Sequence, residues 1–334
     1  MSINYVKEKS QTSIEQSDQE RDGTSRLGRW LKGLKRNIHW LVARLVAIIL
    51  RPGALWDPRN FRLWERRGYH IIPLHFYYPI PDTRELSAKE WRDSQMPGID
   101  FRPDAQRDLL RAISARYSSE YRALPVDANG SGQFHVQNDA FSGIDPYVYY
   151  CIIRRFRPRT VIEVGSGYST LLGARACRQN GGARYVCIDP WPRPLVEEAI
   201  NDVELLRCQV EDLDVRLFEQ LRANDVLFID SSHVVRTAGD VCFIILEVLP
   251  RLAEGVLVHF HDIFFPSDYP KEWIAEKHLF WTEQYLVHAY LAENTHAQVV
   301  FASHYMAKRY PHEVRQSFPD APWIGGASLW IQKC

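Results

Sequence analysis

The stretch VIEVGSGYST, residues 161–170, contains the pattern that decides the fold. An apolar run ends at Val164, Gly165 and Gly167 follow, and Ser169 or Thr170 offers a helix start. Glycines at this point let the backbone turn sharply after a strand and approach a ligand closely, with the next helix N-terminus facing that ligand. The stretch therefore predicts a strand, a glycine turn and a helix around a binding site.

The residues around the glycines separate three classes of nucleotide-binding turn. A P-loop would need a lysine before its final hydroxyl residue, and the stretch contains none. A dinucleotide fingerprint would have Gly or Ala at its sixth position, where GSGYST has Thr170. Glu163, two residues before Gly165, places a carboxylate that suits a cationic ligand and disfavours a pyrophosphate.

From Thr160 onward, short apolar runs alternate with helical stretches. Parallel strands need such crossover connections, so the pattern indicates a parallel, doubly wound α/β sheet. A long loop at 261–273 and a helix at 281–291 interrupt it before the last two runs. We expect strands at 160–164, 184–189, 203–208, 225–230, 255–260, 298–303 and 327–332.

The E-x-G-x-G pattern resembles the first motif of the class I S-adenosylmethionine-dependent methyltransferases, and the resemblance covers about residues 144–333. It implies a Rossmann-like fold with a seven-stranded, mostly parallel sheet, helices on both faces and an N-terminal cap region, and S-adenosylmethionine as the cofactor. By this resemblance Asp189 would bind the ribose hydroxyls, Glu211 or Asp212 the adenine amino group, and Glu163 would lie near the ammonium end. The implied cofactor-binding residues are Glu163, Gly165, Ser166, Gly167, Asp189, Glu211 and Asp212.

Two clusters of polar residues follow neighbouring strands, at 230–233 (DSSH) and 259–262 (HFHD). They are similar to the metal-dependent branch typified by catechol O-methyltransferase, and imply that Asp230, His261 and Asp262 hold a divalent metal. A metal would lower the pKa of an acceptor hydroxyl and orient it. That branch has Asp-Asn where this chain has His261-Asp262, and histidine favours manganese, iron or zinc over magnesium.

The chemistry of transfer stays open between several interpretations. Asp230, His233 and His261 are the catalytic candidates, and without a metal either histidine could act as the general base. His259 lies within a strand and is expected in the core. The aromatic loop 264–273, with Tyr285 and His288, suits an acceptor pocket but does not name a substrate.

The absence of an Asn/Asp-Pro-Pro-Tyr motif after the fourth strand favours transfer to oxygen, and we expect a small-molecule or glycan acceptor. Two alternatives remain: a cephalosporin-hydroxylase-like enzyme of the same fold, and a non-catalytic, membrane-peripheral binding module. Chains of this appearance are mostly bacterial.

The composition is that of an ordinary globular protein: 334 residues, 46% apolar and 25% charged. It excludes collagen-like, disulfide-scaffold and wholly disordered proteins. Six cysteines without a CxxC pair indicate a reducing compartment, so we expect a cytoplasmic protein.

A net charge of zero conceals an uneven distribution, because residues 26–67 carry 11 basic and 2 acidic side chains. We expect a disordered polar tail at 1–25, a basic amphipathic helix at 26–51, an aromatic and proline-rich cap region at 52–143 and the cofactor-binding domain at 144–334. The apolar stripe of the helix could lie on an anionic membrane surface, or dock on its own domain or on a second subunit in a homodimer. We expect no nucleic-acid partner.

Overall fold

The computed structural model describes residues 26–49, 57–88, 91, 93–128, 132–194, 196 and 202–334. Residues 1–86 and 87–334 form two compact units, which are described separately below. The region predicted as a cap, 52–143, is therefore divided between the two units. The predicted polar tail, 1–25, lies outside the described residues.

The first unit contains α2 (Arg26–Ile49), which coincides with the predicted basic amphipathic helix, and α4 (Pro58–Glu65). Asp57 caps α4, since its Oδ1 accepts a hydrogen bond from the Arg59 N–H at 2.8 Å, and Pro58 occupies the first turn, where no N–H is needed. The proline-rich segment 73–82 forms neither helix nor strand. Along the described part of the chain, no helix combines the length and the apolar character needed to cross a membrane.

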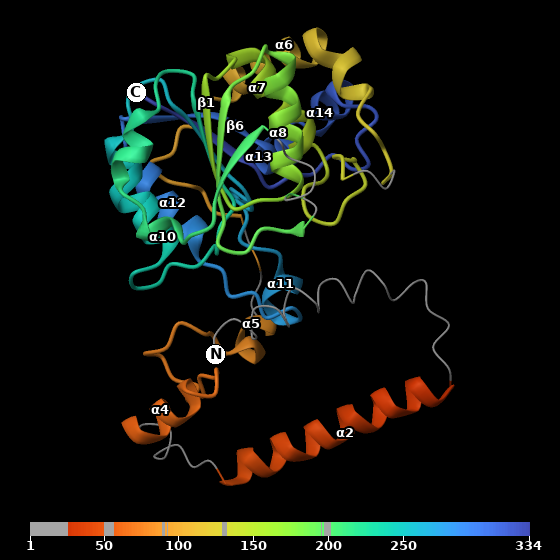
Figure 1. The fold of residues 1–334 in the computed structure, drawn as a ribbon, viewed down its shortest axis with the longest axis vertical. Coiled ribbons are helices and arrows are strands. Elements are labelled where there is room, and N and C mark those ends of the chain that lie inside the picture. Colours follow the sequence, from red (N-terminus) through yellow and green to blue (C-terminus); the bar gives the residue numbers. More distant parts are fainter. Residues whose placement is uncertain are drawn as a thin grey trace. The chain divides into compact units, whose positions relative to one another are not determined.

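The second unit is built on one seven-stranded sheet with the order β3-β2-β1-β4-β5-β7-β6 (Figure 1). Strands β1 to β5 are parallel, and β7 pairs antiparallel with both β5 and β6. The sheet confirms the predicted seven-stranded, mostly parallel α/β fold. Its strands are β1 (Thr160–Val164), β2 (Arg184–Ile188), β3 (Val203–Leu206), β4 (Val226–Ile229), β5 (Leu257–Phe260), β6 (Ala297–Ala302) and β7 (Leu329–Lys333).

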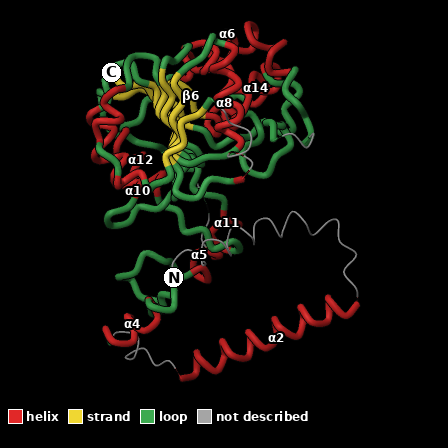
Figure 2. Tube along the Cα trace, in the orientation of Figure 1, coloured by secondary structure: helices red, strands yellow, loops and turns green. Residues whose placement is uncertain are grey.

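Helices cover both faces of the sheet (Figures 1 and 2). Alternate side chains of each strand point to opposite faces, so that Phe228 of β4 belongs to one core and Leu227 to the other. The core of Phe228 includes residues of α6, α7, α8, α13 and α14, and the core of Leu227 includes residues of η4 and α12. The α-helices of this unit, after α5 (Thr83–Ala88) at its boundary, are α6 (Pro103–Arg122), α7 (Asp145–Phe156), α8 (Tyr168–Gln179), α10 (Asp240–Phe243), α11 (Lys271–Ala275), α12 (Glu283–Leu291), α13 (Ser303–Arg309) and α14 (Pro311–Ser317). The unit also contains the 3-10 helices η2 (Val210–Asp212), η3 (Val215–Gln220) and η5 (Leu249–Arg251) and the π-helix η4 (Ile244–Val248).

The sheet order brings the predicted site residues to one edge. Strand β4 lies between β1 and β5, so the loops that follow these three strands leave the sheet side by side. In open α/β sheets, ligands bind outside the carboxyl ends of the strands, where neighbouring loops diverge. This edge carries the glycine turn after β1 and the polar clusters after β4 and β5.

Candidate functional site

The glycine turn after β1 brings two strand ends into close contact. Gly165 has φ +93°, and a Cβ on this residue would lie 2.0 Å from the main-chain oxygen of Asp230. Helix α8 starts at Tyr168, and the N–H of Gly167 donates to Thr170 Oγ1 at 3.0 Å. Any other residue at 165 would be strained in its backbone and would push the β4 loop away.

A cavity of about 310 Å³ lies beside this turn. Its lining carries the carboxylates of Asp189, Glu211, Asp230 and Asp240, against the single guanidinium of Arg236. Asp189 is held in place, because its Oδ2 accepts from Ser166 Oγ at 2.5 Å and its Oδ1 from the Trp191 N–H at 2.8 Å. The excess of negative charge matches a cationic ligand.

The predicted cofactor residues divide into two groups at this cavity. Gly165, Ser166, Asp189 and Glu211 line it. Asp212 is exposed and Gly167 is buried, and neither is part of the lining. Of the two neighbouring acids that end η2, Glu211 is therefore the one that faces the cavity.

Glu163 departs from its expected place at the ligand. It is fully buried outside the lining, and its carboxylate oxygens accept hydrogen bonds from Ser169 Oγ (2.5 Å) and from the Tyr185 hydroxyl (2.6 Å). Burial raises the pKa of Glu163 to about 7, although hydrogen bonds from these hydroxyls oppose the rise. Side chains alternate along β1, and that of Glu163 points into the interior. Its two hydrogen bonds link the start of α8, at Ser169, to β2, at Tyr185.

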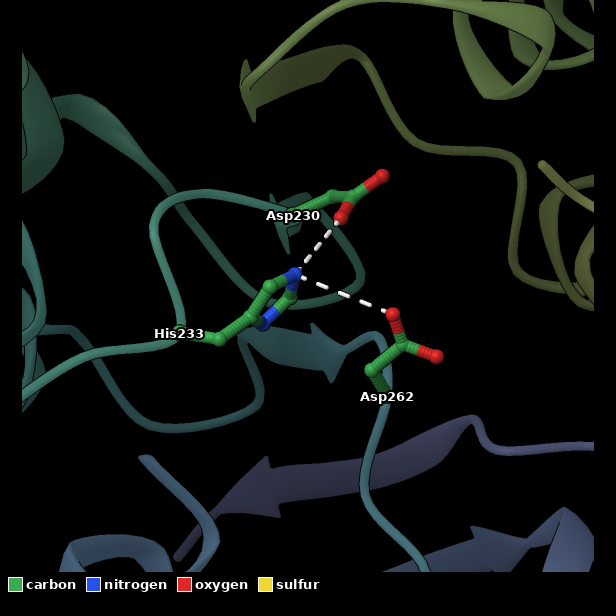
Figure 3. A group of neighbouring side chains, drawn as sticks. All are labelled: Asp230, His233 and Asp262. Atoms are coloured by element: carbon green, nitrogen blue, oxygen red, sulfur yellow. Dashed lines mark ion pairs between the residues drawn. The ribbon is translucent and has the colours of Figure 1, made fainter. Parts of the chain in front are cut away.

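A second cluster lies at the ends of β4 and β5 and comprises Asp230, His233 and Asp262 (Figure 3). His233 Nε2 lies 3.2 Å from Asp230 Oδ1 and 3.8 Å from Asp262 Oδ2. Both His233 (φ +59°) and Asp262 (φ +57°) adopt left-handed backbone conformations, which are unfavourable for residues with a Cβ. Such strain concentrates where the chain must present a side chain in a particular direction.

His233 is also bound from the opposite side. Its Nδ1 lies 2.8 Å from Oε2 of Glu283, a fully buried residue at the start of α12. Burial lowers the pKa of His233, but the hydrogen bonds with Asp230 and Glu283 outweigh it and raise this pKa well above its usual value. The ring of Trp281 covers the imidazole, with 4.3 Å between the ring centroids.

His261 approaches the same two aspartates. Its Nδ1 lies 3.5 Å from Asp230 Oδ1 and 3.6 Å from Asp262 Oδ2, and it is buried without a hydrogen-bond partner among the described residues. Burial lowers the pKa of His261, but Asp262 and Asp230 raise it to about 9 overall. His259, by contrast, is a core residue as expected: it is fully buried and stacks on Phe228 at 4.2 Å.

These side chains fit a divalent cation. Carboxylate oxygens of Asp230 and Asp262 converge with a ring nitrogen of His233. The buried Nδ1 of His261 approaches the same two carboxylates. Of the set predicted from the sequence, Asp230 and Asp262 belong to this group, in which His233 takes the place expected for His261, and His261 lies beside it. Mixed imidazole and carboxylate donors favour manganese, iron or zinc.

Sequence reasoning missed Glu283. It lies 50 residues after its partner His233, and no spacing links two such residues before the fold is known. The only signal was its place in the first turn of the predicted helix at 281–291. Asp240 was also missed: its carboxylate accepts from the Ser232 N–H (2.8 Å) and from Ser232 Oγ (2.6 Å), and so holds the DSSH loop.

This chain is similar to a methyltransferase family model, to an uncharacterized protein and to two O-methyltransferases of solved structure. A family model described as "Methyltransferase domain" matches residues 162–263. An uncharacterized protein of Archaeoglobus fulgidus is 28% identical over 198 residues, which are 56% of this chain and 86% of that protein.

Two solved structures are similar to parts of this chain. The O-methyltransferase TomG from Streptomyces achromogenes is 12% identical, with 75% of this chain and 93% of that chain covered and a TM-score of 0.37. The O-methyltransferase from Bacillus cereus is 13% identical, with 69% and 90% covered and a TM-score of 0.35.

Proposed function

We propose that the chain is a class I, S-adenosylmethionine-dependent methyltransferase, which methylates an oxygen atom of a small-molecule or glycan acceptor. The observation that carries the proposal is the carboxylate-lined cavity at the carboxyl ends of β1, β2 and β4, with the Asp230, His233 and Asp262 cluster beside it. Asp230 belongs to both, so a donor and an acceptor could meet at this residue.

The residues of the cavity fit S-adenosylmethionine. The close approach of Gly165 to Asp230 keeps the turn after β1 and the start of the β4 loop together at one side of the cavity. Asp189, fixed by Ser166 and Trp191, would accept hydrogen bonds from the ribose hydroxyls, and Glu211 would accept one from the adenine amino group. The net negative lining would favour the sulfonium over the uncharged product after transfer.

The cluster would orient the acceptor hydroxyl, whose proton would leave to solvent. A divalent cation held by Asp230, Asp262 and the two histidines would supply a lower pKa for the acceptor hydroxyl. Asp230 and Asp262 set the direction from which the oxygen approaches, and His233 Nε2 faces the same point. Methyl transfer is an in-line displacement, so alignment of donor and oxygen and exclusion of water supply most of the rate enhancement.

The proposal is tested first by ligand binding and then by the product. A ligand at 100 times its dissociation constant stabilises a protein by about 2.7 kcal/mol, so S-adenosylhomocysteine is expected to raise the melting temperature and NAD is not. ¹³C-methyl S-adenosylmethionine, supplied with hydroxylated small molecules and glycans, is expected to give an O-methyl carbon signal. Stabilisation by NAD alone would refute the cofactor, and an N-methyl product would refute the acceptor.

We further propose that α2 attaches the enzyme to an anionic lipid surface, at the cytoplasmic face of a membrane. The helix contains six basic and no acidic residues. Its apolar side chains are exposed, including Leu41 (55%) and Ile48 (74%). Each cation near an anionic leaflet contributes roughly 1 kcal/mol, which adds to the burial of the apolar face.

Vesicle flotation tests whether α2 binds an anionic lipid surface or the apolar face of a second copy of the chain. The full chain is expected to float with phosphatidylglycerol-containing vesicles and not with phosphatidylcholine alone. Leu41→Ser with Leu45→Ser is expected to abolish flotation, whereas Ala43→Ser, on the opposite side of the helix at 100° per residue, leaves it intact. Concentration-dependent dimerisation without flotation would instead show that the apolar face binds a second copy.

A further inference from the structure

The pairing of His233 with Glu283 assigns a task to a residue outside both the cavity and the cation cluster. We propose that Glu283 is a positioning residue, which holds the His233 ring with Nδ1 protonated so that Nε2 faces Asp230 and Asp262. This inference rests on the proposed function, because Nε2 matters only if the cluster acts on an acceptor or a cation. Nδ1 to Oε2 of Glu283 is 2.8 Å, and Nε2 to Oδ1 of Asp230 is 3.2 Å.

Burial of the Glu283 carboxylate is costly in free energy, so an interaction in the folded protein must offset the cost. The residue is fully buried, and its Oε1 has no hydrogen-bond partner among the described residues. A buried carboxylate with one unsatisfied oxygen is destabilising unless a charged or polar partner offsets the desolvation. The carboxylate of Glu283 makes a hydrogen bond to His233. We infer that the buried charge serves to orient the His233 ring.

The backbone at the start of α12 also binds the backbone of His233. The N–H groups of Thr282 and Glu283 both donate to the main-chain oxygen of His233, at 2.8 and 3.0 Å. The Val235 N–H donates to Thr282 Oγ1 at 2.7 Å. These bonds offset the left-handed conformation of His233, whose φ of +59° would otherwise be unfavourable.

The contacts on the two ring nitrogens give each nitrogen a separate role. A carboxylate can only accept, so the Glu283 contact requires a proton on Nδ1 of His233. Nε2 is then the ring nitrogen left to face Asp230 and Asp262, where it donates to Asp230 in the cation-free cluster and would give up that proton to bind a cation. Carboxylate–histidine pairs of this type fix ring orientation and raise ligand basicity at metal sites, and loss of the carboxylate typically reduces metal affinity about 10- to 100-fold.

The test uses the full chain, the isosteric substitution Glu283→Gln and the matched control Glu276→Gln, an exposed acid near the end of α11. In metal-free wild type, ¹⁵N-histidine NMR is expected to show a slowly exchanging, downfield Nδ1–H proton that disappears in His233→Ala. Glu283→Gln is expected to move this signal upfield, because a neutral carbonyl is a weaker acceptor. Absence of the signal from wild type refutes the proposal even if every variant at 283 fails to fold.

A second measurement, Mn²⁺ titration by calorimetry, checks the consequence for the cluster. Glu283→Gln is expected to bind Mn²⁺ about 10- to 100-fold more weakly than wild type, and Glu276→Gln to bind it unchanged. An unmoved NMR signal or wild-type Mn²⁺ affinity in Glu283→Gln overturns the proposal. If wild type bound neither Mn²⁺ nor S-adenosylhomocysteine, the proposed function would fail, while the NMR signal would still decide the role of Glu283.

Discussion

Replacement of Glu163 by glutamine is expected to remove a large part of the pH dependence of stability. The carboxyl group is fully buried beneath the glycine turn, and burial raises its pKa from 4.5 to about 7. The folded protein therefore keeps this proton at pH values where the unfolded chain has lost it. Below pH 4.5 both states are protonated, and stability falls as the pH rises from 4.5 through 7.

The size of the effect follows from the shift. Each unit of pKa corresponds to about 1.36 kcal/mol, so the shift is equivalent to about 3 kcal/mol, most of which is lost between about pH 5 and pH 8. Glutamine has the same shape and cannot ionise. Its amide can be accommodated because Tyr185 can accept from it and turn its own proton to Tyr149, whose hydroxyl lies 3.0 Å away.

The assay is urea unfolding of wild type and Glu163→Gln across this pH range. The difference between the two proteins cancels other titrating groups and is expected to move in favour of the variant by about 2 to 3 kcal/mol. Glu254→Gln, at an exposed position, is the control and should show a constant difference from wild type. A Glu163→Gln difference that varies by less than about 1 kcal/mol would show that Glu163 is not held neutral by burial.

Three further predictions concern the site. Gly165→Ala is expected to destabilise the protein by more than about 2 kcal/mol, because its Cβ would meet Asp230. Gly181→Ala is its control in the same urea assay, since Gly181 also has positive φ but open space around it, and an equal loss for both would show that the contact is unimportant. Asp189→Asn is expected to weaken S-adenosylhomocysteine binding roughly 10- to 100-fold by calorimetry, from the loss of charge-assisted hydrogen bonds. The same change at exposed Asp212 should have no effect, and equal losses would contradict the assignment of the cavity. Asp262→Asn is expected to reduce Mn²⁺ affinity at least about tenfold, again with Asp212→Asn as the control, and full Mn²⁺ binding by Asp262→Asn would exclude Asp262 as a ligand.

The sequence was sufficient to predict the sheet because strand-forming runs and crossover helices are local signals. VIEVGSGYST predicted a strand, a turn and a helix, and the structure has β1, a glycine turn and α8 in that order. The expectation that Asp230 and Asp262 lie at neighbouring strand ends came instead from the resemblance to the methyltransferase family, which supplied the strand order, and the pairing of β4 with β5 agrees with it. Only the order of the strands was needed for that inference.

Side-chain direction is the part that local patterns could not supply. Glu163 was expected at the ligand, yet the alternation along β1 turns it into the interior toward Ser169 and Tyr185. Glu211 and Asp212 are adjacent, and the tight turn of η2 decides that the first of them lines the cavity. Glu283 reaches His233 only because α12 returns to the end of β4, a consequence of the tertiary fold.

Asp230 belongs both to the cavity and to the cation cluster, so a shift of this residue would alter both. Its main-chain oxygen lies where a Cβ of residue 165 would be, while its carboxylate lines the cavity and faces His233 and His261. The missing side chain of Gly165 therefore sets how closely the cation cluster can approach the cavity. Since in-line transfer loses rate steeply when reacting atoms are displaced by about 1 Å, a substitution at Gly165 should disturb the cluster as well as the cavity, although Gly165 touches no group of the cluster except Asp230.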